Sequence, residues 1–259
     1  MTLARAEPPA GNTARFAAQP LAGGGTPTHV WLNARRELPM LDLAGCAEMI
    51  VVAAHPDDET LGFGATSATL AAMGVPVAVV SASDGGASQP GLSGPQRDRL
   101  EQVRRAELRS AVNALGLSEP ISLGLPDGQI ADHEDRLADL LTEILDGRGT
   151  RTWCAATWCG DGHPDHEAVG RAAAVAVERT RTQLLEYPVW MWHWAYPDDP
   201  AVPWDRAYRS RLDPLAVGRK YVAAQCFSSQ LVPATVDAAP VLPPAVLQRL
   251  LAVGEVVFR

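Results

Sequence analysis

Residues 49–59 read MIVVAAHPDDE, and this stretch decides the fold class. Six apolar residues in succession, ending at Ala54, are typical of a strand that is covered on both faces, as in a parallel sheet. His55 follows directly, and Pro56 keeps it in extended backbone. The strand therefore brings an imidazole and acidic side chains to its carboxyl end, where open α/β sheets bind their ligands.

The rest of the chain alternates strands and helices. Further strands are expected at 75–80, 120–123, 152–157 and 183–187. Helices are expected at 61–73, 96–115, 135–145 and 164–179, with a last one at about 214–225. This order predicts a Rossmann-like, three-layer α/β fold with a mostly parallel sheet, plus an irregular, Trp-rich C-terminal region. Because no G-x-G-x-x-G follows the first strand, the sequence does not support a dinucleotide site.

Length and composition set the domain organisation. The 259 residues, 47% hydrophobic and 20% charged, are enough for one large α/β domain with a sizeable core. We expect a single domain over residues 46–259, preceded by an N-terminal extension over 1–45 that is partly irregular. Residues 1–28 are rich in Pro, Gly, Ala and Thr without periodicity, which predicts disordered or irregular chain.

Charge and hydropathy exclude several classes of protein. A net charge of −8 without a basic run argues against nucleic-acid binding. No apolar stretch is long enough for a membrane span, and the N-terminus lacks the apolar core of a secretory signal. We therefore expect a cytoplasmic protein, and the sequence leaves a homo-oligomer open. The cysteines show no CxxC spacing and are expected as free thiols: Cys46, Cys154, Cys159 and Cys226.

A second histidine cluster, HPDHE at residues 163–167, follows the strand at 152–157. Its proline suits the first turn of a helix, and two histidines three apart there can face one cavity. The two clusters lie at the same sheet edge if the fold is as predicted. Together they supply two imidazoles and a carboxylate, the three protein ligands of a catalytic zinc with one position open. A solvated surface turn explains either motif alone, but it explains both at two strand ends poorly.

The motifs AHPDDE (54–59) and HPDH (163–166) resemble the signatures of the PIG-L, or LmbE-like, family of zinc-dependent de-N-acetylases. The resemblance implies one Zn²⁺ per chain, bound by ligands from both motifs: His55, Asp58 and His166. It further implies that Asp57 is the general base and that His163 is the electrophilic partner, oriented by Asp165. The residues alone leave open whether iron replaces zinc.

Two further segments resemble the family's substrate-facing elements. Arg104 and Glu107 look like its arginine-x-x-glutamate helix, and LGLPDG at 123–128 looks like one of its loops. The resemblance implies that Arg104 contacts a sugar or an anionic group and that Asp127 hydrogen-bonds sugar hydroxyls. From the residues alone, a solvated helix face and a plain Pro-Asp-Gly turn explain these positions equally well.

The chain also departs from the family pattern. Asp161 stands where similar deacetylases carry a tyrosine, and Phe227 stands where the family often shows a histidine. Lys220, the single lysine, falls in a segment that the resemblance places near the site. These departures leave the implied zinc ligands intact but make the identity of the substrate unsafe to transfer.

The run WMWHW at residues 190–194 alternates like a strand. Its tryptophans would then share one face, and we name Trp192 as a substrate contact because aromatic rings stack on pyranose faces. An aromatic core or an oligomer contact is the open alternative, since such rings bury much area. His193 is expected to be a hydrogen-bonded structural residue and not a further ligand.

The predicted function is that of a zinc-dependent amidohydrolase. It would remove an N-acetyl or N-acyl group from an N-acetylglucosamine-type glycoside, an intermediate of a bacterial thiol cofactor or a secondary metabolite. The alternatives are a zinc hydrolase of a non-sugar amide or ester, and a catalytically silent metal-binding protein. The silent alternative fits less well because loss of function would strike the base Asp57 or the electrophile His163 first.

Overall fold

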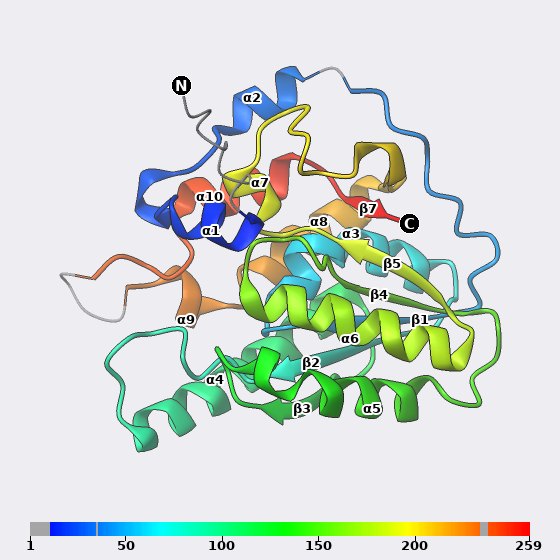
Figure 1. Ribbon diagram of the computed structural model, residues 1–259, viewed down its shortest axis with the longest axis horizontal. Helices are drawn as coiled ribbons and strands as arrows, with labels where there is room; N and C mark the ends of the chain where they lie inside the picture. The colour runs from blue at the N-terminus through cyan, green and yellow to red at the C-terminus, as the bar shows by residue number, and fades with distance from the viewer. Residues whose placement is uncertain (1–10, 35, 234–237) are drawn as a thin grey trace, which may run out of the picture.

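A computed structural model describes residues 11–34, 36–233 and 238–259. In these residues a seven-stranded sheet has the order β3-β2-β1-β4-β5-β7-β6 (Figure 1). The strands are β1 (Glu48–Ala53), β2 (Val77–Ser83), β3 (Ile121–Leu125), β4 (Thr152–Thr157), β5 (Gln183–Tyr187), β6 (Ala207–Arg209) and β7 (Val256–Phe258). Strands β1 to β5 pair in parallel, whereas β7 is antiparallel to both β5 and β6. The predicted mostly parallel α/β sheet is confirmed.

Helices cover both faces of the sheet, which explains the continuous apolar strands. The first face carries α3 (Asp58–Ala72), α4 (Gly94–Leu115) and α8 (Pro214–Ala224), and the second carries α5 (Glu134–Leu145) and α6 (Pro164–Thr180) (Figure 1). Along β1, Met49 and Val51 pack into the first core, while Ile50 and Val52 pack into the second. Both side-chain rows of a central strand are therefore buried. Among the described helices, none is long and apolar enough to cross a membrane.

The strand order reverses between β1 and β4. These strands pair in parallel, with Glu48 opposite Thr152 and Val52 opposite Ala156. Their carboxyl ends therefore lie side by side, at the point where open α/β sheets form ligand crevices. The two histidine motifs, which follow β1 and β4 directly, are brought together by this topology as predicted.

The N-terminal extension contains more helix than its composition indicates. Within the stretch predicted to be irregular, the structure has α1 (Asn12–Ala17) and the 3₁₀ turn η1 (Leu21–Gly23); α2 (Thr28–Asn33) begins at its end. None of the residues of α1 is buried, so the helix has no core of its own. Polar contacts to distant residues hold it instead, among them the ion pair between Arg15 and Asp199. Residues 1–10 of the same prediction lie outside the described residues.

The strand predicted for residues 190–194 is wrong. Met191–Trp194 forms the one-turn helix α7, and the carboxylate of Asp161 accepts hydrogen bonds from the backbone N–H groups of Val189, Trp190 and Met191. The helix predicted at 214–225 is present as α8, but the prediction that it is the last helix is wrong. Later elements follow: α9 (Ser228–Leu231), α10 (Pro244–Ala252) and β7. The three residues of β7 are too few to show a period in the sequence.

A buried ion pair ties the C-terminal part of the chain to α3. Lys220 Nζ donates to Glu255 Oε1 (2.9 Å) and to the carbonyl of Leu61 (2.7 Å). Glu255 also accepts from the backbone N–H of Ala65 (2.8 Å) and of Thr66 (2.7 Å). In a regular helix the Leu61 carbonyl and the Ala65 N–H bond to each other. The ion pair thus supports α3, the helix that begins with Asp58. Lys220 does not itself line the cavity described below.

Candidate active site

His55 and Asp58 are placed by the turn that joins β1 to α3. Asp58 is the first residue of α3, and its Oδ2 accepts a hydrogen bond from the backbone N–H of His55 (2.9 Å). The turn thereby folds the carboxylate back beside the imidazole, with His55 Nδ1 3.4 Å from Asp58 Oδ2. The opposite nitrogen, Nε2, lies 3.0 Å from Asp127 Oδ1 and 3.1 Å from Asp165 Oδ2. These carboxylates fix the proton on Nε2 and leave Nδ1 free to face Asp58.

His166 approaches Asp58 from the first turn of α6. Its side chain is fully buried, with Nε2 3.2 Å from Asp58 Oδ2 and Nδ1 2.8 Å from Asp161 Oδ2. One ligand atom from each of His55, Asp58 and His166 lies within 4.8 Å of the others. The structure therefore brings together the three residues that the family resemblance implies as zinc ligands.

The environment of His166 Nε2 tests whether these residues fit a metal. When the imidazole is neutral, Asp161 accepts the proton on Nδ1, and Nε2 presents a lone pair toward a carboxylate oxygen of Asp58. Nε2 is buried, and no atom of the described chain gives it a hydrogen bond. Two lone pairs that face each other repel, whereas a cation between them is attracted to both. The residues present thus fit a divalent cation bound through nitrogen and oxygen ligands.

The charges of the site also call for a cation. Burial alone would lower the pKa of His166, but Asp58 and Asp161 outweigh it and raise the pKa to about 9. Burial is likewise outweighed at His55, whose pKa is held well above its usual value by Asp127, Asp165 and Asp58. Without a metal, the carboxylates thus favour a second proton on each imidazole. A bound metal ion would displace that second proton.

Asp57 lies beside the cluster of His55, Asp58 and His166 but does not belong to it. Its backbone has φ 137°, a conformation that a residue with a side chain rarely adopts. Glu59 Oε2 accepts from its backbone N–H (3.0 Å), and Arg104 Nη2 lies 3.4 Å from its Oδ2. Burial, opposed by Arg104 and assisted by Asp58, raises the pKa of Asp57 to about 7. This is the range in which a carboxylate acts well as a general base at neutral pH.

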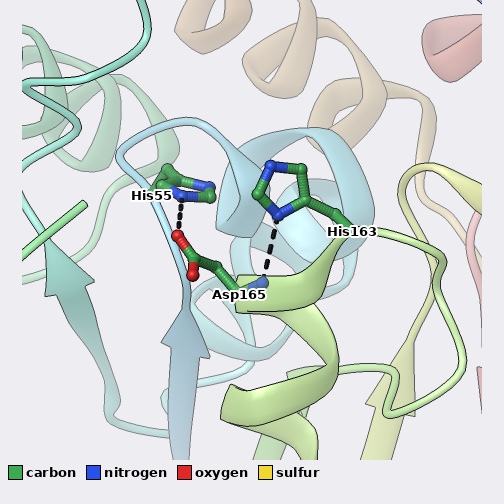
Figure 2. Close-up of side chains that lie close together, drawn as sticks. All are labelled: His55, His163 and Asp165. Atoms are coloured by element: carbon green, nitrogen blue, oxygen red, sulfur yellow. Dashed lines mark hydrogen bonds and ion pairs between the residues drawn. The ribbon is translucent and has the colours of Figure 1, made fainter. Parts of the chain in front are cut away.

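Asp165 contacts His163 through its backbone N–H, and its carboxylate, which was expected to orient His163, turns to His55 instead. Asp165 Oδ2 lies 3.1 Å from His55 Nε2, while the backbone N–H of Asp165 donates to His163 Nδ1 (3.2 Å). Both contacts are drawn in Figure 2. The carboxylate also accepts from the backbone N–H groups of Gly128 and Ile130. At the start of a helix the backbone N–H groups are free, so one of them takes the place of the carboxylate. Burial, together with His166 and His55, lowers the pKa of His163 to about 3, so this imidazole is neutral and carries its proton on Nε2.

Asp127 has a partner that the sequence did not reveal. Besides its contact with His55, its Oδ2 accepts from the backbone N–H of Ala87 (2.7 Å). Burial would raise the pKa of Asp127, but the interaction with His55 outweighs it and lowers the pKa. Asp127 therefore holds His55 in place and also lines the cavity, where the predicted hydrogen bond to a sugar hydroxyl stays a prediction.

Arg104 and Glu107 are buried, so the alternative of a solvated helix face is wrong for both. Arg104 donates to the carbonyls of Pro56 (2.7 Å) and Gly85 (3.0 Å), next to Asp57. Glu107 accepts from the side chains of Ser228 and Ser229 and from the backbone N–H of Ser229. Arg104 lines the cavity, and its contacts with the Pro56 carbonyl and with the Asp57 carboxylate hold Asp57 in place.

Trp192 does not lie at the cavity, contrary to the prediction. Its ring meets that of Trp31 edge-on with centroids 4.9 Å apart, and its carbonyl accepts from Trp31 Nε1 (2.9 Å). The cavity is lined by Trp190 instead. In a helix, residues two apart point about 200° away from each other, whereas in a strand they share a face. Trp192 was predicted at the cavity because residues 190–194 were predicted to form a strand. His193 is hydrogen-bonded to Gln19 and Arg249, as expected of a structural residue.

A cavity of about 470 Å³ opens onto the site. Its polar lining consists mainly of the groups described above: His55, Asp57, Asp58, Arg104, Asp127 and His163. The four cysteines are free thiols, as predicted. The contact of Asp161 with His166 could not be predicted from the sequence, in which Asp161 stands out only as a departure from the family pattern.

The fold and the site define an α/β protein with a cluster of His and Asp side chains, able to hold a metal ion, at the switch point of its sheet. Residues 50–177 match the PIG-L family, described as GlcNAc-PI de-N-acetylase. The chain thus carries a PIG-L domain over these residues, as its two histidine motifs predicted.

Comparison with individual proteins shows how far the likeness extends. The 1D-myo-inositol 2-acetamido-2-deoxy-alpha-D-glucopyranoside deacetylase of Mycobacterium sp. (strain KMS) is 36% identical over 164 residues, which cover 54% of this chain and 53% of the relative. The chain thus spans about half the length of that relative.

Solved structures share the fold at lower sequence identity. A deacetylase of the teicoplanin biosynthesis pathway has a TM-score of 0.59 and 22% identity, covering 71% of this chain and 84% of its own. GalB, the 4-carboxy-2-hydroxymuconate hydratase of Pseudomonas putida KT2440, has a TM-score of 0.54 and 19% identity, covering 78% and 82%. Because a hydratase and a deacetylase share this fold, the reaction has to be argued from the site.

Proposed function

We propose that the chain is a zinc-dependent hydrolase that removes the N-acetyl group from an N-acetylglucosamine-type glycoside. The observation that carries the proposal is the orphaned Nε2 of His166 opposite Asp58, with the unliganded carboxylate of Asp57 beside them. The PIG-L domain and the deacetylase relative from Mycobacterium support the class of reaction. That relative is named for a 2-acetamido-2-deoxyglucopyranoside of myo-inositol, which favours a biosynthetic glycoside as the substrate class.

In this proposal His55, Asp58 and His166 hold one zinc ion. When bound, zinc acts as a Lewis acid that polarises the amide carbonyl and activates water. The two imidazoles are neutral in that state, since their outer nitrogens donate to Asp127, Asp165 and Asp161.

Asp57 is the general base. It accepts a proton as water attacks the amide carbon, and it returns that proton to the amide nitrogen as the C–N bond breaks. The products are a free amine and acetic acid, which releases its proton to solvent. Arg104 and the backbone contact with Glu59 hold the carboxylate in position. A positioned base of this kind contributes roughly 10² to 10⁴ in rate.

His163 is the electrophile, and it acts as a neutral donor. Its Nδ1 is occupied by the Asp165 N–H, so Nε2–H is available to the developing oxyanion. Unlike a protonated histidine, a neutral imidazole can donate this hydrogen bond without first taking up a proton from solvent. Donors of this kind typically contribute roughly 10² to 10³ in rate.

The test is hydrolysis of a panel of N-acetylglucosaminides, N-acetyl amino acids and acetyl esters by the purified, zinc-loaded protein, measured as free amine from the amides and as free acetate from the esters. Release from a sugar that is abolished by chelation and restored by zinc supports the proposal. Hydrolysis confined to a non-sugar amide or an ester contradicts the proposed sugar substrate but supports the proposed hydrolase activity. No release from any compound, with one zinc bound per chain, contradicts the enzymatic proposal altogether.

A further inference from the structure

The cavity has a second wall that is apolar and lies outside residues 50–177. One part comes from the N-terminal strap, which we define as residues 12–21, and the other from the segment before α10. The strap residues in the lining are Phe16, Ala17, Gln19, Pro20 and Leu21, and the C-terminal ones are Val241 and Leu242. Apart from Gln19 they present hydrocarbon to the cavity. A polar site and an apolar wall thus share one space.

Polar contacts fix the strap in this position. Asn12 Nδ2 donates to the carbonyl of Gly160 (2.8 Å), and Thr13 Oγ1 donates to Glu167 Oε2 (3.1 Å). At its other end, Gln19 Nε2 donates to the carbonyl of Trp194 (3.1 Å). The guanidinium of Arg15 pairs with buried Asp199 and lies over the ring of Trp194. The strap is therefore anchored along its length to the segments around α6 and α7.

The ring of Phe16 lies close to His163 and Trp190. The centroid of its ring is 5.2 Å from that of Trp190 and 6.1 Å from that of His163. The apolar wall thus begins directly beside the imidazole that we assign as the electrophile. On the opposite side, the backbone N–H of Leu242 donates to the carbonyl of Gln230 (2.8 Å), which fixes the C-terminal part of the wall.

From this arrangement we infer that the substrate carries an apolar group next to its N-acylated sugar, and that Phe16 determines specificity for it. The inference rests on the proposed function. A sugar without such a group leaves the wall in contact with water, whereas an alkyl or aryl group removes that surface from water. Each methylene that becomes buried raises kcat/KM by about fourfold when the contact is made in the transition state. The apolar group is either the aglycone or an extended acyl chain, since both lie next to the reacting amide.

The experiment compares three substrates with the zinc-loaded protein: methyl N-acetylglucosaminide, octyl N-acetylglucosaminide and methyl N-octanoylglucosaminide. We expect kcat/KM for at least one octyl-bearing substrate to exceed that for the methyl N-acetyl compound by about tenfold or more. A preference for the octyl glycoside assigns the wall to the aglycone, and a preference for the octanoyl amide assigns it to the acyl chain. Either result supports the inference.

Variants link the preference to the strap. The ratio compared is kcat/KM for the preferred eight-carbon substrate divided by kcat/KM for methyl N-acetylglucosaminide. Phe16→Ala should reduce this ratio by about fivefold or more, and Phe16→Leu should retain most of it. Leu32→Ala is the control, because Leu32 lies on α2 with 58% exposure and does not line the cavity; it should leave the ratio unchanged.

Two results would overturn the inference, and they differ from each other. Equal rates on all three substrates, or a ratio that Phe16→Ala does not alter, reject the apolar group or its assignment to Phe16 while the deacetylase proposal stands. Absence of amine from every substrate rejects the proposed function, and the inference falls with it.

Discussion

Asp161 Oδ2 lies 2.8 Å from His166 Nδ1, and this contact decides which nitrogen of the imidazole faces Asp58. With the proton held on Nδ1, Nε2 offers its lone pair to a metal. An asparagine in place of Asp161 would present an NH₂ group or a single oxygen, and the backbone N–H groups of Val189, Trp190 and Met191 would compete for that oxygen.

We therefore expect Asp161→Asn to bring an amide donor to Nδ1 and to move the proton to Nε2, which blocks the metal. Loss of such an outer contact typically weakens metal affinity by about 10- to 100-fold. Zinc titration of the chelator-treated protein measures this change. Asp205→Asn, at an exposed position, is the control. An affinity equal to that of the unmodified protein would show that Asp161 does not set the tautomer.

His163→Ala should retain one zinc per chain and lose about 10² to 10³ in kcat/KM, because it removes the donor to the oxyanion without touching a metal ligand. Steady-state amine release and metal analysis on the same sample check both parts. The exposed His29 serves as a control in His29→Ala. Loss of zinc from the His163 variant would instead favour the second cluster that the geometry allows, formed by His55, His163 and Asp165.

Lys220→Met should destabilise the protein by about 3 to 5 kcal/mol, because it leaves the carboxylate of Glu255 buried without its counter-charge. Urea unfolding at neutral pH measures the change in the free energy of unfolding. The neighbouring Arg219 is exposed, so Arg219→Met should change stability by less than about 1 kcal/mol. Equal effects of the two substitutions would contradict the structural role of the ion pair.

His193 should make the anchoring of the strap sensitive to acid. Burial lowers the pKa of His193, the carbonyl of Gln19 partly offsets this, and the charge of Arg249 adds to it. A histidine with a lowered pKa is neutral when folded, so its contribution to stability is complete above the unfolded pKa of about 6.5 and is lost as the pH falls through the folded pKa.

His193→Gln keeps an acceptor for Arg249 and a donor for Gln19 but does not titrate. The variant should therefore lose less stability than the unmodified protein between about pH 7.5 and pH 5. Urea unfolding of both proteins at these two pH values supplies the comparison. A difference between them that is the same at both pH values would contradict the assignment.

The sequence predicted that the proposed metal ligands come together, because their placement depends on few features of the chain. Apolar runs locate β1 and β4, parallel pairing aligns their ends, and His55, Asp58 and His166 follow within a few residues. Each step is a local pattern or a general property of parallel sheets. Helix α4 was equally predictable, since Ser93 begins it with a capping box and Gly116, with φ 81°, ends it.

The contacts around the ligands depend on tertiary structure and were predicted less well. Asp165 follows His163 by two residues, but its carboxylate points to His55, which comes from the turn after β1. Trp192 was assigned to the cavity because five residues do not distinguish a strand from one helical turn. Phe16 escaped notice because α1 is held by distant partners such as Asp199 and buries none of its own residues.

The division of roles between Asp57 and the ligands is the central claim, and the most direct measurement is amine release by Asp57→Asn assayed together with its metal content. Asparagine keeps the shape of the side chain but cannot accept the proton. The account predicts one zinc per chain, as in the unmodified protein, and a kcat/KM for the zinc-loaded variant that is lower by about 10² to 10⁴. A variant that retains full activity, or one that fails to bind zinc, would contradict it.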